Sequence, residues 1–269
     1  MRINTNTAAM NTYSRLTSAN GARSSSMAKL SSGMRINKAG DDAAGLSISE
    51  KMKNQISGLK QATRNAQDGI SLIQTAEGAL NETHSILNRM RDLSVQANNG
   101  TNADEDLTAI KAEMDELIGE ITNIAETTQF NNTALLDGEG VQGLTLQIGA
   151  NAGEVLSLSI ADMSAAGLGV DGLDVTADAE AAITALDTAI GSVSTQRSEL
   201  GAKQNRLEHT INNLTTTSEN LTEANSRIRD VDMAEEMMEF TKNNILSQAS
   251  TAMLAQANQM PQGVLQLLG

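Results

Sequence analysis

Residues 179–228 read AEAAITALDTAIGSVSTQRSELGAKQNRLEHTINNLTTTSENLTEANSRI and hold the longest regular pattern in the chain. The seam residues recur at alternating steps of four and three without a break. Heptads sustained over this length are typical of a long helix packed along partner helices, as in a coiled coil. The predicted seam consists of Ala179, Ile183, Leu186, Ile190, Val193, Arg197, Leu200, Gln204, Leu207, Ile211, Leu214, Ser218, Leu221, Asn225 and Ile228.

The composition agrees with a mainly α-helical protein. Among 269 residues there are one Tyr, two Phe, no Trp and a single Pro, and the formal net charge is −14. A core built from Ala, Leu, Ile and Met in place of aromatics favours long helices packed side by side. The absence of cysteine excludes disulfides and cysteine-based zinc sites.

Two further helical patterns and one alternating pattern lie in the middle of the chain. Apolar residues recur at helical spacing over 47–98 and 102–127, and we expect both segments to form an antiparallel bundle with 179–228. Between 102–127 and 179–228, the segments 144–148 and 156–160 alternate apolar and polar residues around a short loop, which predicts a β-hairpin. The fold class is therefore a long antiparallel helical bundle or coiled coil with a small hairpin region.

Local signals refine this layout. Asp41 and Asp42 lie within a glycine-rich connector at 33–46 and can cap the helix after it. Thr101, followed by Asp104, resembles a capping box for the next helix. Three glycines inside the helix over 47–98, Gly58, Gly69 and Gly78, each cost helix propensity, so we expect a close neighbouring backbone or a point of flexing there.

The two ends of the chain are predicted to pair as a separate helical domain. Residues 243–269 carry no charged side chain and are too rich in Asn, Gln and Ser for a membrane span. Residues 4–32 form a helix pattern whose seam turns polar at Asn20 and Arg23. We expect the two segments to pair, to stay disordered in a single chain, and to fold against other copies. The predicted self-assembly residues are Ala9, Tyr13, Leu16, Met27, Leu30, Ile245, Leu246, Ala249, Ala252, Met253 and Met260.

Charge and segment patterns bear on partners and location. Residues 1–40 carry six basic and no acidic side chains, which suits either nucleic-acid binding or a helix face meeting acidic neighbours. We favour the second, because the basic residues are scattered and the whole chain is acidic. The sequence predicts no membrane insertion and no secretory signal, so composition alone would indicate a cytoplasmic protein.

We find no pattern of an enzyme, a cofactor site or a metal site. His84 and His209 fall outside any H-E-x-x-H motif, and both are expected to be interior, hydrogen-bonded histidines. The methionines near the C-terminal end could suggest a soft-metal site, but methionine is also an adaptable packing residue at irregular interfaces. We interpret them as packing residues.

Five long stretches of the chain are specific enough to compare with a known family. They are MRINTNTAAMNTYSRL at 1–16, LSSGMRINKAGDDAAGLSISEKM at 30–52, NAQDGISLIQTAEGAL at 65–80, QRSELGAKQNRLEHTINNL at 196–214 and SRIRDVDMAEEMMEFTKNNILSQASTAMLAQANQ at 226–259. These stretches resemble bacterial flagellin. The resemblance implies a structural subunit that polymerises into the hollow, helical flagellar filament used for swimming. It covers both ends and most of the middle of the chain, in a minimal form without inserted outer domains.

The family's domain scheme can be placed on this chain. It implies an inner domain, D0, made of the N-terminal helix at 1–32 and the C-terminal helix at 226–269, with a connector at 33–46. It implies an outer domain, D1, made of the helices, loop and hairpin at 47–176 and the long helix at 177–225. Polar and glycine positions in the seams, namely Asn20, Arg23, Gly58 and Gly69, are expected to permit alternative subunit packings.

The resemblance also implies partners and a location. They are further copies of the chain, the flagellar cap and hook-junction proteins, and an export chaperone. The flagellar secretion apparatus would export the chain to the extracellular filament without a cleaved signal peptide. The family patch read by the innate sensor Toll-like receptor 5 resembles LNRMRDLSVQ at 87–96, which gives Arg89 and Leu93, with Glu113 on the next helix.

Three alternatives remain at this point. A hook–filament junction protein shares similar ends and a structural role. A flagellin carrying an inserted metallopeptidase would need an insert and an H-E-x-x-H motif, and the sequence has neither. A cytosolic coiled-coil scaffold would not be found outside cells.

Overall fold

The computed structural model describes residues 5–268, with side chains as far as residue 260. The described residues form five helices and four short strands. They divide into two compact units, each treated separately below. Unit 1 holds the chain up to Asn54 and from Asn220 onward, and unit 2 holds Gln55–Glu219. The division falls inside two continuous helices, whereas the predicted domain limits at 46–47 and 225–226 were placed near helix ends.

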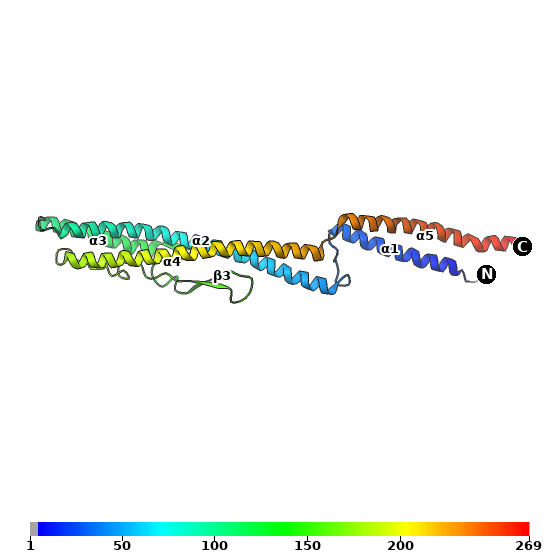
Figure 1. Ribbon diagram of the computed structural model, residues 1–269, viewed down its shortest axis with the longest axis horizontal. Helices are drawn as coiled ribbons and strands as arrows, with labels where there is room; N and C mark the ends of the chain where they lie inside the picture. Colours follow the sequence, from blue (N-terminus) through cyan, green and yellow to red (C-terminus); the bar gives the residue numbers. More distant parts are fainter. Residues whose placement is uncertain (1–4, 269) are drawn as a thin grey trace. The chain divides into compact units, whose positions relative to one another are not determined.

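Unit 2 is a bundle of three helices around one apolar core. It contains most of α2 (Ala43–Ala97), all of α3 (Asp104–Thr127) and most of α4 (Ala179–Arg229), which lie side by side in Figure 1. The helices form because apolar residues recur at steps of three and four along each of them. Its largest fully buried side chains include Ile73, Leu80, Met114, Ile121 and Leu186. The predicted bundle is therefore confirmed.

The seam of α4 is wider than the heptad pattern predicted. Leu186, Val193, Leu200, Leu207 and Leu214 are buried as expected. A second row, Ala182, Ala189 and Gln196, is also buried, while the alternate predicted positions Ile183, Ile190 and Arg197 are only half-buried. A coiled-coil seam faces one partner, but this part of α4 packs against more than one neighbour, so its buried stripe broadens.

The predicted hairpin is formed by β3 (Leu144–Gln147) and β4 (Val155–Leu158), which pair antiparallel with Leu146 opposite Leu156. It lies against α2 at the two glycines that the sequence singled out. A Cβ atom at Gly58 would lie 3.0 Å from Ala150 Cβ, and one at Gly69 would lie 2.6 Å from Leu146 Cδ1. Between them, Asn65 Nδ2 donates to the Gln147 carbonyl at 3.0 Å. Gly58 and Gly69 thus provide room for the hairpin, whereas Gly78 has open space around it.

A second, smaller strand pair follows α3. β1 (Gln129–Phe130) and β2 (Thr133–Ala134) are joined by Asn131 and Asn132, which both have positive φ angles. Asparagine tolerates this backbone region better than most residues, so it suits a two-residue hairpin turn.

Unit 1 contains α1 (Thr7–Ser32) and α5 (Met233–Leu268), which lie side by side and antiparallel in Figure 1. The pairing of the two terminal segments is as predicted. Both segments are helical in a single chain, which differs from the expectation of disorder. Each helix buries part of its surface against the other, so neither is an isolated amphipathic helix in water.

The connectors of unit 1 are tied together by backbone hydrogen bonds. Gly33 ends α1 in the left-handed conformation, with φ at 70°. Met34 then forms an antiparallel bridge with Asp230, and the Arg35 N–H donates to the Arg229 carbonyl at 2.7 Å. The side chain of Arg229 reaches Glu50 at 2.8 Å, which links the connector to the start of α2.

Helix capping follows the sequence in one place and departs from it in another. Asp42 accepts a hydrogen bond from the Gly45 N–H at 2.8 Å and so caps α2, as predicted. The predicted box at Thr101 is wrong. The cap residue of α3 is Ala103, whose N–H donates to the Asp106 carboxylate at 3.1 Å. The acidic run after Ala103 supplies this acceptor at Asp106, two residues after Asp104.

Candidate functional site: the terminal helix pair

The face that joins α1 to α5 is built from small and polar side chains. Ala19 and Ser26 of α1 are buried, and so are Asn243, Ser247 and Ala257 of α5. On α5 the buried and half-buried positions recur at steps of three and four, which is the heptad pattern of a two-helix contact. Sequence reasoning missed Asn243 and Ser247 because they are polar, although their spacing with Ala257 carried the signal.

Polar contacts set the register of the two helices. Ser247 Oγ donates to Asn20 Oδ1 at 2.9 Å, and Asn6 Nδ2 donates to the Ala257 carbonyl at 2.7 Å. At the other end of the pair, Lys29 and Glu236 form an ion pair at 3.5 Å. A sliding movement would break all three contacts together, so one register is favoured. The Lys29 pair also agrees with interpreting the basic N-terminal segment as a helix face meeting acidic neighbours.

The predicted self-assembly residues of α5 lie outside this contact and are exposed to solvent. Ile245 is 60% exposed, Leu246 47% and Met253 64%. Ala249, Ala252 and Met260 are exposed as well. Because this part of α5 has no charged residue, its outward surface is apolar and uncharged, which is unusual for a surface that stays in contact with water.

On α1 the predicted residues divide into two groups. Ala9, Leu16 and Leu30 are half-buried toward α5, whereas Tyr13 and Met27 are 63% and 52% exposed. The alternating pattern had placed all five on one stripe. The structure shows that Tyr13 and Met27 lie on a different side of the helix from the contact with α5.

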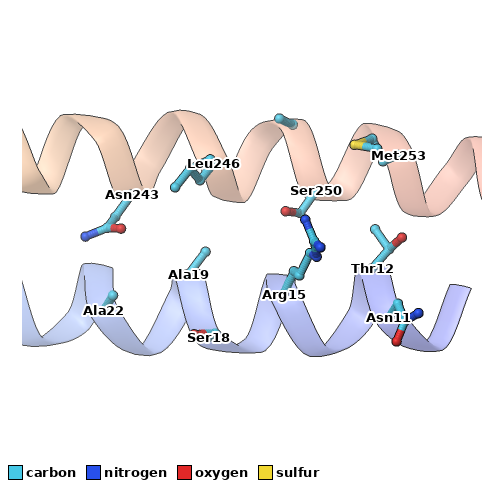
Figure 2. A pocket seen from close by; sticks show the side chains of 11 residues that line it. Asn11, Thr12, Arg15, Ser18, Ala19, Ala22, Asn243, Leu246, Ser250 and Met253 are labelled. Atoms are coloured by element: carbon cyan, nitrogen blue, oxygen red, sulfur yellow. The ribbon is translucent and has the colours of Figure 1, made fainter. Parts of the chain in front are cut away.

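An open groove runs along one side of the pair, with a volume of about 660 Å³. Leu246, Ala249 and Met253 of α5 line it, together with Ala19 and Ala22 of α1. Figure 2 shows Arg15 extending from α1 toward Ser250 of α5. The lining is therefore mixed: apolar residues of α5 meet polar residues, including Asn11, Thr12 and Ser18 of α1.

The predicted receptor patch on unit 2 is only partly exposed. Arg89 of α2 and Glu113 of α3 form an ion pair at 2.7 Å, with about half of each side chain exposed, at 55% and 46%. Leu93 is 2% exposed and belongs to the core. The structure therefore brings Arg89 and Glu113 together on the surface and places Leu93 beneath it.

Further ion pairs join elements of unit 2 near this patch. Arg91 pairs with Asp187 of α4 at 2.6 Å, and this carboxylate raises the pKa of Arg91. Lys111 of α3 pairs with Asp174 at 2.7 Å. The Lys111 ammonium, together with hydrogen bonds from Thr176, holds the pKa of Asp174 well below its usual range, and the pKa of Lys111 is raised. The Lys111–Asp174 pair fastens the segment before α4 to α3, and the Arg91–Asp187 pair joins α2 to α4.

The two histidines differ from what the sequence predicted. His209 is exposed, so it is not an interior residue. His84 is half-buried, and its Nδ1 atom has no hydrogen-bond partner among the described residues.

Residues 5–268 contain no cluster of three His, Cys, Asp or Glu side chains able to hold a metal ion. No described helix has the length and hydropathy to cross a membrane.

The helical bundle, the paired terminal helices and the exposed apolar face of α5 define a structural protein of the self-associating, coiled-coil type. Comparison with known proteins makes this specific. The model of the bacterial flagellin N-terminal helical region matches residues 3–140, and that of the bacterial flagellin C-terminal helical region matches residues 183–268. The chain belongs to the bacterial flagellin family.

Curated relatives support this assignment over the whole chain. Flagellin of Bacillus subtilis (strain 168) is 56% identical, and flagellin of Halalkalibacterium halodurans is 58% identical, each covering 100% of both chains. The crystal structure of Bacillus cereus flagellin shares 36% identity with a TM-score of 0.52, covering 60% of this chain and 94% of that one. A putative flagellar hook-associated protein from Vibrio parahaemolyticus has a TM-score of 0.61 at 14% identity, covering 71% of this chain and 100% of that one, and shows a shared fold alone.

The family settles the general function. The chain is a structural subunit of the bacterial flagellar filament, which assembles from copies of the same chain, and its relatives form the extracellular filament. The hook–filament junction alternative is not better supported, because the full-length relatives at more than half identity are flagellins. These relatives are named as structural proteins, in agreement with the expected absence of an enzyme activity.

Proposed function

We propose that the α1–α5 pair is the surface through which subunits assemble head to tail into the hollow filament. The observation that carries this proposal is the exposed, uncharged apolar face of α5, formed by Ile245, Leu246, Ala249, Ala252, Met253 and Met260. Met10, Tyr13 and Met27 of α1 are exposed apolar residues of the same helix pair. A contact between different faces of neighbouring copies produces a helical polymer when its rotation does not close into a ring.

The absence of charge has a physical role in this assembly. Each buried, unpaired charge would cost several kcal/mol, and a position surrounded by other copies leaves no water to solvate it. The hydrogen-bonded contacts of Asn20 with Ser247 satisfy polar groups inside one subunit. The apolar face can then be covered entirely by neighbours.

Single substitutions on α5 test this proposal. Met253→Lys places a charge on the exposed face, and we expect it to raise the critical concentration for assembly by about a hundredfold or more. Met253→Leu keeps the apolar shape and is the matched control, which should assemble like the original chain. Sedimentation of seeded filaments measures both. Equal assembly of the two variants would contradict the proposal.

The remaining partners and the route of export belong to the same proposal. We infer that the flagellar secretion apparatus exports the chain without a cleaved signal peptide, with the help of an export chaperone, and that the ends of the filament meet the cap and hook-junction proteins. The high identity to flagellins over the full length supports this inference. Sequencing the N-terminus of protein sheared from filaments is the test, and a removed leader would contradict it.

Recognition by Toll-like receptor 5 is proposed for the surface around Arg89 and Glu113. Their ion pair fixes two charged groups of α2 and α3 in one place, and both remain accessible. Leu93 would act from below by holding α2 against the core, since it is almost fully buried. In a receptor-reporter assay, Arg89→Ala should reduce the response while leaving the melting temperature nearly unchanged. Leu93→Ala should lower both the response and the melting temperature. A full response to Arg89→Ala would refute this role.

A further inference from the structure

The methionines of the described chain divide sharply between the two units. In unit 2, Met90, Met114 and Met163 are at most 3% exposed. In α1 and α5, seven methionines are between 49% and 67% exposed, and we call them the thioether face. The thioether face consists of Met10, Met27, Met233, Met237, Met238, Met253 and Met260.

Thioethers are the principal oxidant-sensitive groups of this chain. It has no cysteine and no tryptophan, and it has one tyrosine. Two more methionines of unit 1, Met34 and Met52, are half-buried. The sulfur of Met34 accepts a hydrogen bond from Arg229 Nε at 3.1 Å, so it already has a structural contact. The residues open to attack are therefore concentrated on the α1–α5 pair, which is the part of the chain proposed for assembly.

We propose that the thioether face is a site of reversible oxidation that controls whether a subunit can assemble. The oxidant is a peroxide. A lone pair of the methionine Sδ attacks one peroxide oxygen, the O–O bond breaks, and the sulfoxide S=O bond forms while the leaving oxygen takes up a proton. For hydrogen peroxide the other product is water, and the sulfur loses the two electrons that the peroxide gains. This inference rests on the proposed assembly role of α1 and α5.

The polarity of the sulfoxide explains why oxidation would prevent assembly. A methionine sulfoxide is polar and carries a strong hydrogen-bond acceptor in place of a flexible apolar group. When an apolar side chain of a neighbouring copy covers it, that acceptor loses water without gaining a donor. Each such group weakens association by about tenfold. Seven such groups distributed over α1 and α5 would prevent polymerisation, while the buried methionines of unit 2 would leave the bundle unchanged.

Assembly itself protects the same residues. In the filament the thioether face is covered, so its methionines should react slowly once a subunit is incorporated. The sensitive species is the unassembled subunit. Reduction of the sulfoxides by methionine sulfoxide reductases of both epimer specificities restores the apolar face.

The test uses the full-length chain treated with hydrogen peroxide. Peptide mass spectrometry should find sulfoxide at the seven exposed methionines at least about tenfold faster than at Met90, Met114 and Met163, which react only when the core opens. The treated subunit should no longer extend filament seeds, with the helical content of unit 2 unchanged, and enzymatic reduction should restore extension. Oxidised subunits that extend seeds like untreated ones would overturn the proposal.

Two controls separate this inference from the proposed function. A variant with leucine at all seven positions should assemble equally well with and without peroxide treatment. Loss of its assembly only after treatment would place the sensitivity elsewhere and refute the role of the thioether face. If deletion of residues 243–269 leaves untreated subunits able to polymerise, the proposed function fails. If that deletion blocks assembly but full oxidation does not, only the present inference fails.

Discussion

Replacing Gly58 by alanine should destabilise the hairpin region, although alanine is the better helix former. The substitution gains about 1 kcal/mol of helix propensity. The new Cβ would lie 3.0 Å from Ala150 Cβ and 3.3 Å from Ala150 Cα, so backbone of the hairpin loop must move. Overpacking of this kind costs about 1–3 kcal/mol. The net effect ranges from neutral to a loss of about 2 kcal/mol in the free energy of unfolding.

Gly78 provides the matched control on the same helix. A Cβ there meets nothing within 4 Å, so Gly78→Ala should gain the full propensity of about 1 kcal/mol. The two variants should therefore differ by about 1–3 kcal/mol in urea unfolding followed by circular dichroism. Adding Ala150→Gly should recover stability in the Gly58→Ala background more than in the original chain. Equal stabilisation by Gly58→Ala and Gly78→Ala would refute the assignment of Gly58 as the place where the hairpin packs.

Three other predictions concern charge, register and filament form. Asp174→Asn should make the free energy of unfolding less dependent on pH. The folded-state pKa of Asp174 is depressed, so its ionised form favours folding, and the original chain loses this stabilisation as the pH falls below about 4. Urea unfolding at pH 7 and at pH 3 measures the difference, and a pH dependence equal to that of the original chain would contradict the prediction. Ser247→Ala should cost the α1–α5 pair about 1 kcal/mol, since Asn20 loses its donor; thermal unfolding should show it, with the exposed Gln248→Ala as a neutral control. Substitution at Asn20 or Gly69 should alter the filament waveform in electron micrographs, and unchanged waveforms would argue against alternative packings at these positions.

Much of the fold could be predicted because apolar residues recur at regular spacing along its helices. The three-and-four spacing in 179–228 required packing partners, and the apolar rows in 47–98 and 102–127 supplied them. The hairpin followed from simple alternation. The prediction placed α4 on a single seam, however, because periodicity along one helix does not report how many neighbours surround it.

The candidate site was less accessible to sequence reasoning. The apolar pattern predicted Leu246 and Met253 for self-assembly, but it did not identify the residues of α5 that contact α1. The actual contact uses Asn243, Ser247 and Ala257, because two helices can approach closely only where side chains are small. Larger apolar residues are consequently left outside, available to other copies. Likewise, the residue type of Leu93 matched the receptor patch of the family, whereas its burial depends on how α3 packs against α2.

The contacts made by the connectors of unit 1 could not be predicted from the sequence pattern either. Met34 and Asp230 are far apart in the chain, and nothing in their local residues indicates a bridge. The contact arises because the antiparallel pairing of α1 and α5 places the end of α1 beside the start of α5, where Met34 and Asp230 lie. The ion pair of Arg229 with Glu50 follows from the same arrangement.

The central claim is that the uncharged end of the chain drives assembly, and one measurement tests it most directly. A variant lacking residues 243–269 is mixed with filament seeds and examined by electron microscopy, beside the full-length chain at the same concentration. We predict a soluble protein with a cooperatively unfolding helical bundle and no growth of the seeds. Filaments growing from this variant would show that assembly does not depend on the exposed face of α5.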